Sequence, residues 1–193
     1  MKDYINTVFN EAIEAHRRFA LDGAKVIEDM AKEIAACFLR GNKLLIFGNG
    51  GSAADSQHIA AEFASRFVME RPPLPAIALT TDTSLLTAVG NDYDFNDIFD
   101  KQVSALANPG DIAWGISTSG NSENVLKGLK RAISNEAVTM GFAGGNGGKM
   151  TGLCDKLLIV NNSVTARVQE IHIMCAHIIC GLVDEIMFGK FAG

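Results

Sequence analysis

Apolar residues repeat at helical spacing along the first forty positions of the chain. Ile5, Phe9 and Ile13 recur every four residues among polar neighbours, which is the pattern of an amphipathic helix. An Asp-Gly pair then interrupts the pattern, and a Gly-Asn pair ends a second apolar segment. The sequence therefore predicts two helices, over residues 2–20 and 24–40.

Further along, the pattern changes to short apolar runs separated by longer mixed segments. Most gaps between the runs are long enough for a helix, and such alternation favours a parallel sheet covered by helices on both faces. We expect an α/β fold: a three-layer sandwich with a five-stranded parallel sheet, an N-terminal helical extension and a long C-terminal helix. A single domain would span 1–193, with the first helices in 1–40 and the α/β core in 41–193. The predicted strands are 43–48, 76–80, 112–116, 137–142 and 156–160.

The last predicted element is a helix over roughly residues 164–188. It is apolar on nearly every side, unlike a helix that rests on a solvated surface. Such a helix is either packed deeply within its own chain or buried between subunits. We favour burial between subunits, because the N-terminal helices also carry apolar residues on faces expected to be exposed.

Composition narrows the class of protein. With 48% hydrophobic and 20% charged residues among 193, the chain is typical of a soluble globular domain. The net charge is −5 and there is no dense run of Lys or Arg, so we expect no nucleic-acid partner. No apolar run reaches the roughly 20 residues that span a bilayer, and the first residues lack the features of a signal peptide. We therefore expect a cytoplasmic protein without a membrane partner, whose four cysteines are buried free thiols.

Three segments follow the carboxyl ends of predicted strands: residues 48–52, 80–92 and 117–122. In an open parallel sheet, ligands bind at these strand ends, near the point where the strand order reverses. We therefore expect the three loops to face one crevice.

The first loop contains Gly48, Gly50 and Ala53, which match the G-x-G-x-x-A pattern of dinucleotide-binding sites. Such a site also needs an acidic residue about 20 positions further on, at the end of the second strand. The nearest suitable residue is Asp82, about 30 positions beyond Ala53. A nicotinamide cofactor is therefore disfavoured.

A plainer interpretation of the same loop is a tight glycine turn that opens a helix, with Ser52 as the N-cap and Asp55 as its partner. This leaves His58 and Glu62 unexplained. They are four residues apart, so both lie on one helix face, where an imidazole beside a carboxylate can transfer protons or bind a metal. The alternative is an ordinary solvated His–Glu pair.

The third loop places four hydroxyls within six residues at the start of a predicted helix. Free backbone N–H groups and the helix dipole favour an anion there, and a sugar phosphate suits hydroxyls and amides. Without a lysine this is not a Walker loop. The alternative is a serine-rich turn with a cap, and Glu123 must point away if an anion binds. The four hydroxyl residues are Ser117, Thr118, Ser119 and Ser122.

Polar residues also interrupt the apolar C-terminal helix, from Arg167 to His172 and again at His177. A buried histidine usually makes a structural hydrogen bond. Two histidines with a Gln-Glu pair on one apolar helix nevertheless favour a functional role.

Taken together, these motifs resemble the sugar isomerase (SIS) domain family along essentially the whole chain. The resemblance is closest to the branch of the family that isomerises heptose phosphates, because all the motifs occur in the same order. It implies a flavodoxin-like sheet. The motifs are the segments 47–52, 89–92, 95–99, 115–122, 147–150 and 166–172, together with His58, Glu62 and His177.

The resemblance implies an aldose–ketose isomerase that converts sedoheptulose 7-phosphate to D-glycero-D-manno-heptose 7-phosphate. This is the first step toward nucleotide-activated heptose for lipopolysaccharide or another glycan. It also implies a homotetramer with active sites between subunits, and one zinc ion per subunit.

The resemblance assigns the zinc to His58, Glu62, Gln169 and His177. Periodicity alone favours Glu170 over Gln169, because residues seven apart share a helix face. Glu62 is the candidate base and His177 the candidate acid, and the division between metal binding and proton transfer stays open. The substrate contacts that the resemblance implies are Asn49, Gly50, Gly51, Ser52, His58, Glu62, Asn91, Asp92, Ser117, Thr118, Ser119, Ser122 and Gln169.

A non-catalytic SIS module is the alternative. Similar proteins act as binding partners, among them a tetrameric partner of the bacterial replication initiator. The presence here of all four implied ligands and both candidate catalytic groups favours the enzyme.

Overall fold

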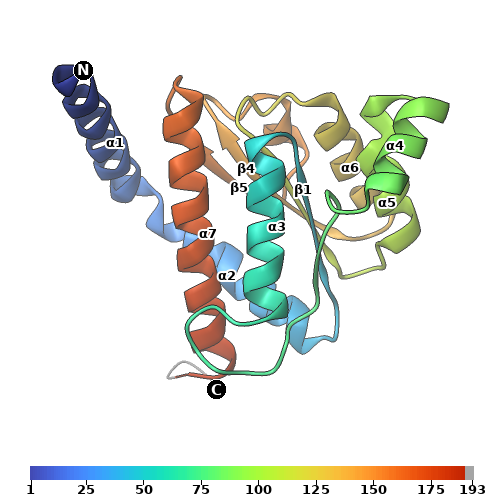
Figure 1. Cartoon of the computed structure of the whole chain (residues 1–193). Helices are drawn as coiled ribbons and strands as arrows, with labels where there is room; N and C mark the ends of the chain where they lie inside the picture. The colour runs from blue at the N-terminus through green and yellow to red at the C-terminus, as the bar shows by residue number, and fades with distance from the viewer. Residues whose placement is uncertain (190–193) are drawn as a thin grey trace.

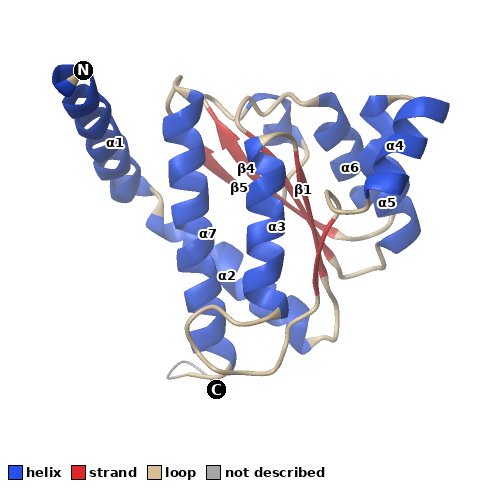
Figure 2. Cartoon of the chain, in the orientation of Figure 1, coloured by secondary structure: helices blue, strands red, loops and turns tan. Residues whose placement is uncertain are grey.

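A computed structural model describes residues 1–189 of the chain, so the last four positions of the predicted domain lie outside the described residues. Five parallel strands form one sheet in the order β2-β1-β3-β4-β5. This order is the flavodoxin-like one, as expected. Figure 2 shows this sheet in red among the blue helices. The strands are β1 Leu44–Gly48, β2 Ala76–Ala78, β3 Ile112–Ser117, β4 Val138–Gly144 and β5 Lys156–Val160.

Helices cover both faces of the sheet, which confirms the three-layer sandwich (Figure 1). One face carries α2 (Ala24–Leu39), α3 (Gly51–Ala64) and α7 (Thr165–Met187). The other carries α4 (Thr83–Asp92), α5 (Ile98–Leu106) and α6 (Glu123–Ser134). The remaining elements are α1 (Lys2–Asp22) and two short 3-10 helices, Phe95–Asp97 and Gly148–Gly152.

The central strand β1 shows how the two layers are specified. Leu44 and Ile46 belong to the core under α2, α3 and α7, whereas Leu45 and Phe47 belong to the core under α4, α5 and α6. All four are fully buried. Side chains alternate across a strand, so a strand buried on both faces is a continuous apolar run, as it is here.

The C-terminal helix α7 packs against α2 and α3 (Figure 1). Its inner side chains Ile171, Cys175, Ile179 and Val183 are fully buried within the chain, while Ile178 on the outer side is 43% exposed. Deep packing within the chain therefore accounts for most of the apolar surface of this helix, and burial between subunits is not needed to explain it.

The segment 80–92 is not the loop that the sequence analysis expects. Most of it is α4, which begins after Asp82, whose side chain accepts a hydrogen bond from the Leu85 N–H at 2.9 Å. An N-terminal cap of this kind satisfies a backbone donor that the first helical turn leaves unpaired.

Among the described residues, no helix is long and apolar enough to cross a membrane.

The cysteines are all free, as the sequence analysis expects. Cys37, Cys175 and Cys180 are buried, and Cys154 is half-buried. Burial raises the pKa of the Cys37 and Cys175 thiols to about 12, so neither is a reactive thiolate at neutral pH.

Candidate active site

The loop after β1 opens α3 through its backbone. Gly50 has a φ of +55° and is the N-cap, so the helix begins two residues earlier than a Ser52 cap would allow. The expected cap at Ser52 is therefore wrong: Ser52 is buried in the first turn, where its carbonyl accepts from the Ser56 hydroxyl at 2.8 Å. A positive φ is the conformation that glycine adopts without strain.

Asn49, in the same loop, is held by an asparagine that the sequence analysis overlooks. The side-chain amides of Asn49 and Asn124 donate to each other, at 2.8 and 2.9 Å. Asn124 is buried in the first turn of α6. The pair thus joins the loop after β1 to the start of α6, beside the point between β1 and β3 where the strand order reverses.

The hydroxyl-rich loop after β3 folds into a compact turn at the start of α6. Ser117 lies at its centre, with its Oγ 2.9 Å from Ser122 Oγ and 3.4 Å from Ser119 Oγ. Ser122 occupies the N-cap position of α6. Ser119 and the first helical residue, Glu123, are exposed to solvent. Three of the four predicted hydroxyls therefore gather at a helix N-terminus, where an anion is favoured.

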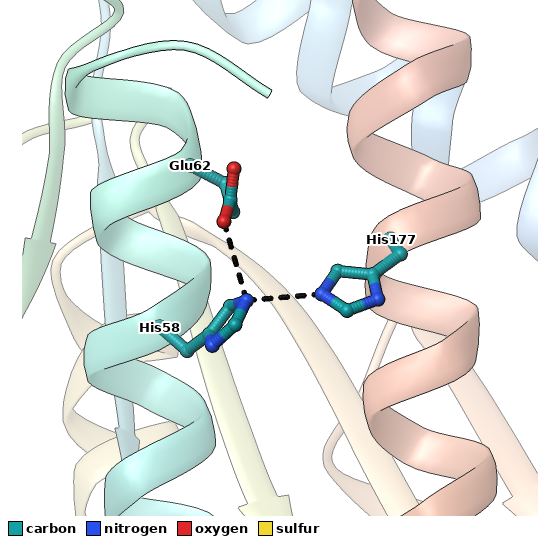
Figure 3. A group of neighbouring side chains, drawn as sticks. All are labelled: His58, Glu62 and His177. Carbon is teal, nitrogen blue, oxygen red and sulfur yellow. Dashed lines mark hydrogen bonds and ion pairs between the residues drawn. The ribbon is translucent and has the colours of Figure 1, made fainter. Parts of the chain in front are cut away.

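Three side chains converge between α3 and α7 (Figure 3). His58 Nε2 lies 3.2 Å from Glu62 Oε1 and 3.0 Å from His177 Nε2. His58 and Glu62 come from successive turns of α3, and His177 faces them from α7 (Figure 3). The three predicted residues are thus brought together, and the cluster stays open to solvent because His58 is half exposed.

The spacing of this cluster fits a metal ion. Zinc–nitrogen bonds of about 2.0–2.1 Å at tetrahedral angles place neighbouring ligand atoms about 3.3 Å apart. One ligand atom from each residue lies within 4.8 Å of the others, and two of the separations are close to that value. Two imidazoles and a carboxylate are ligands that zinc accepts, and they leave positions for others.

Gln169 lies further along α7, beside the start of α3. A Cβ atom at Gly51 would come within 1.8 Å of its Nε2, so only glycine leaves room for this amide. The Gln169 amide lies beside the Asp55 carboxyl and acts to lower its pKa. Eight residues separate Gln169 from His177, about 12 Å along the helix axis. Its role as a metal ligand therefore stays a prediction.

Glu170, which periodicity favours, is wrong as a member of the cluster. Its carboxylate pairs with Arg167, at 2.7 Å for the contact between Arg167 Nε and Glu170 Oε2. Arg167 also donates to the Val8 carbonyl of α1, at 3.2 Å. The Arg167–Glu170 pair therefore stabilises the contact between α7 and α1. The side chain of Gln169, in contrast, lies against the start of α3.

Asp55 is a second residue of the site whose role the sequence analysis missed, since it is not the partner of a Ser52 cap. Burial raises the pKa of its carboxyl, while the Gln169 amide and His58 act to lower it. Its Oδ2 is buried without a hydrogen-bond partner in the part of the chain that the structure describes. The only sequence signal is its spacing of three before His58 on α3, which places both on one side of the helix.

Asn91 and Asp92 lie at the carboxyl end of α4 and are exposed. Their side chains bond to each other, with Asn91 Nδ2 2.8 Å from Asp92 Oδ1. Neither belongs to the cluster of His58, Glu62 and His177. Their predicted contact with a substrate stays a prediction.

An open parallel sheet, a hydroxyl-rich helix N-terminus and a His–Glu–His cluster together define an α/β protein suited to phosphorylated sugars. A family model described as SIS domain matches residues 8–144, and the chain belongs to that family. It is 53% identical to the phosphoheptose isomerase of Aquifex aeolicus over 187 residues, which cover 97% of this chain and 98% of the relative. Within the SIS domain family, the chain is therefore a member of the phosphoheptose isomerase group.

Two further relatives support membership in the phosphoheptose isomerase group. The phosphoheptose isomerase of Nitratidesulfovibrio vulgaris strain Hildenborough is 53% identical over 184 residues, covering 94% of this chain and 88% of the relative. The solved structure of the phosphoheptose isomerase from Neisseria gonorrhoeae matches with a TM-score of 0.91 and 41% identity, covering 95% of this chain and 98% of that one. These matches extend beyond the SIS model, which ends before α7 and so excludes His177.

Proposed function

We propose that this protein is an aldose–ketose isomerase that converts sedoheptulose 7-phosphate to D-glycero-D-manno-heptose 7-phosphate. The observation that carries the proposal is the convergence of His58, Glu62 and His177 between α3 and α7. Three similar proteins named phosphoheptose isomerase support the choice of substrate. The product would supply the synthesis of nucleotide-activated heptose.

The substrate would lie between the serine loop and the cluster. Its phosphate suits the start of α6, where Ser117, Ser119 and Ser122 supply hydroxyls and the helix dipole favours negative charge. The sugar hydroxyls would reach the loop from Asn49 to Gly51, and the reacting carbons would lie beside Glu62. Thr118, Ser52, Asn91 and Asp92 complete the proposed contacts.

The reaction moves one proton between neighbouring carbons and one between their oxygens. Glu62 takes the proton from carbon 1 of the ketose while His177 protonates the carbonyl oxygen on carbon 2, which gives an enediol. Glu62 then returns its proton to carbon 2, and His177 accepts the proton from the oxygen on carbon 1. Both residues end as they began, as general acid–base catalysis requires. Phe67 stacks on the His177 ring, with centroids 5.5 Å apart, and fixes its orientation.

We propose one zinc ion per subunit, held by His58, Glu62 and His177 with Gln169 as a further ligand. When bound, it would polarise the substrate carbonyl and favour the negative charge that develops on oxygen. Oε1 of Glu62 faces His58, so Oε2 is the oxygen assigned to the substrate proton. Nε2 of His177 also faces His58, so Nδ1 is the nitrogen assigned to the proton exchanged with the substrate oxygens. Metal analysis of protein purified without chelator tests this proposal, and zinc at well below one equivalent per chain contradicts it.

Turnover of sedoheptulose 7-phosphate, followed by NMR for the aldose phosphate, tests the enzyme. The alternative, a binding module, predicts a folded, zinc-loaded protein that binds the sugar phosphate without converting it. Comparing ketose phosphates of five, six and seven carbons distinguishes a heptose isomerase from another sugar-phosphate isomerase.

We propose a cytoplasmic homotetramer whose active sites lie between subunits. Exposed apolar side chains on α1 support assembly, among them Phe9 at 65% exposure. The free cysteines fit a reducing compartment.

A further inference from the structure

The loop that joins α3 to β2 carries an enclosed arginine. The side chain of Arg71 is 1% exposed and that of Asp184 is 2% exposed, and Arg71 Nε lies 2.9 Å from Asp184 Oδ1. Asp184 belongs to α7, seven residues beyond His177, so the two residues share one face of that helix. The arginine therefore binds the same face of α7 that carries His177.

Arg71 also holds the carboxyl end of α3, the helix that supplies the other two cluster residues. Its Nη2 donates to the Glu62 carbonyl at 2.8 Å, and its Nη1 to the Phe63 carbonyl at 2.7 Å. The carbonyls of a last helical turn have no donor within the helix, and a cation there suits the negative end of the dipole. Arg71 thus contacts the backbone of the candidate base directly.

The same guanidinium also binds the backbone of the loop that joins α3 to β2. Nη1 also donates to the Ser65 and Pro72 carbonyls, at 3.1 and 3.2 Å. Between these anchors lies Phe67, whose ring stacks on His177 with an interplanar angle of 19°. One side chain therefore joins α3, α7 and the loop that carries Phe67.

We propose that Arg71 and Asp184 are positioning residues that hold α3 and α7 in the arrangement in which His58, Glu62 and His177 converge on one cation. This inference rests on the proposed function, since it takes those three side chains to be metal ligands. A buried ion pair is weak evidence for stability alone. The planar fork of arginine, however, binds several fixed acceptors at once, which is what positioning two helices requires.

Titration of the metal-free full chain with Co²⁺, followed by visible absorption, tests the inference. Arg71→Lys keeps the charge but loses the fork that reaches both helices. Asp184→Asn keeps an acceptor oxygen but removes the charge on α7. We expect each variant to bind Co²⁺ about tenfold more weakly or worse, with an altered spectrum, as outer-shell substitutions do.

Asp111→Asn is the matched control. Asp111 is as buried as Asp184 and pairs with Lys43, but it joins the segments where β1 and β3 begin rather than the helices α3 and α7. This variant should lose stability and keep wild-type Co²⁺ binding.

Three results overturn the inference. One is a folded Arg71→Lys and a folded Asp184→Asn that both bind Co²⁺ with the wild-type affinity and spectrum. Another is failure of both to fold where Asp111→Asn folds, because the pair would then serve folding alone. The third is a wild-type protein that binds no Co²⁺, which removes the metal site itself and is seen in the first titration.

Discussion

At the scale of single residues, local and distant geometry make separate contributions to the site. His58 and Glu62 are one helical turn apart, so α3 alone brings their side chains to 3.2 Å. His177 joins them at 3.0 Å from 119 positions away, because α7 packs against α3. The spacing of the first pair could be predicted from the local pattern of α3, whereas the contact with His177 could be predicted only through the resemblance to the family.

Glu62→Gln tests the candidate base. We expect a folded protein whose kcat falls by at least about 100-fold, because an amide cannot accept the carbon-bound proton. Steady-state kinetics with sedoheptulose 7-phosphate measure the loss. Glu70→Gln, which removes an exposed carboxylate from the loop after α3, is the control and should keep its activity. Near-normal turnover by Glu62→Gln would refute the assignment.

Ser119→Ala tests the phosphate cradle. Loss of one hydroxyl donor to a charged group costs about 1.5–3 kcal/mol, so we expect KM to rise roughly tenfold or more while kcat changes little. Ser134→Ala removes a hydroxyl that bonds to the Lys130 carbonyl at the other end of α6, and should leave KM alone. An unchanged KM for Ser119→Ala would argue against phosphate binding at this loop.

His172 should make stability depend on pH. Burial lowers its pKa to about 4 from the ordinary value of 6.5. Between these values the unfolded chain binds a proton that the folded protein rejects, so the free energy of unfolding falls as the pH falls through this window. The loss reaches about 3 kcal/mol.

Urea unfolding across that window, at one protein concentration, measures the effect. His172→Gln keeps a donor for the Ala143 carbonyl, which His172 Nε2 contacts at 3.2 Å, but cannot take up the proton. Its stability should therefore fall less steeply with pH than that of the wild type. Equal slopes for the two proteins would contradict the prediction.

At the scale of elements, hydrophobic periodicity predicts the helices and strands well and their ends less well. β2 ends at Ala78 rather than residue 80, because this edge strand pairs with β1 over three residues. The helix α4 is missed, although Asp82 before Thr-Ser-Leu-Leu carries a capping signal. The order of the strands in the sheet follows neither from hydrophobic periodicity nor from capping signals, because it depends on which elements pack together.

Asn124→Ala tests the link between the loop after β1 and α6. It leaves the Asn49 amide without its partner, so we expect a loss of about 1–3 kcal/mol in stability. KM should rise as well, because Asn49 is no longer held beside the substrate.

The control for this link is Asn135→Ala, at the carboxyl end of α6, where the amide bonds to the Val103 and Ala107 carbonyls. It should lose stability and keep its KM. Urea unfolding measures the stability of both variants, and steady-state kinetics measure their KM. A normal KM in Asn124→Ala would contradict a positioning role for Asn124.

At the scale of the whole molecule, α1 is the element that the rest of the chain leaves most uncovered (Figure 1). Tyr4, Ile5, Phe9 and Ile13 are all exposed on it. Apolar surface of this kind marks an interaction site. The proposed tetramer predicts a solution mass of about 82 kDa, four times the 20.6 kDa of the chain.

Light scattering coupled to size-exclusion chromatography measures the solution mass. Phe9→Asp should lower it, because a charge in an apolar interface is costly to bury. Ile133→Asp alters an exposed apolar side chain of α6 and should leave the mass unchanged. A monomeric wild type, or a tetrameric Phe9→Asp, would contradict assembly through α1.

The sequence by itself determined what depends on neighbours along the chain. The apolar runs specify strands buried on both faces, the spacing of four places His58 and Glu62 on one side of a helix, and the hydroxyls from Ser117 to Ser122 gather in one turn. Only the tertiary structure decided that Gln169 meets Asp55, that Asn49 pairs with Asn124, and that Arg71 bridges α3 and α7. Each of these contacts depends on the rotation and offset of packed elements, which the shared core fixes and no local pattern encodes.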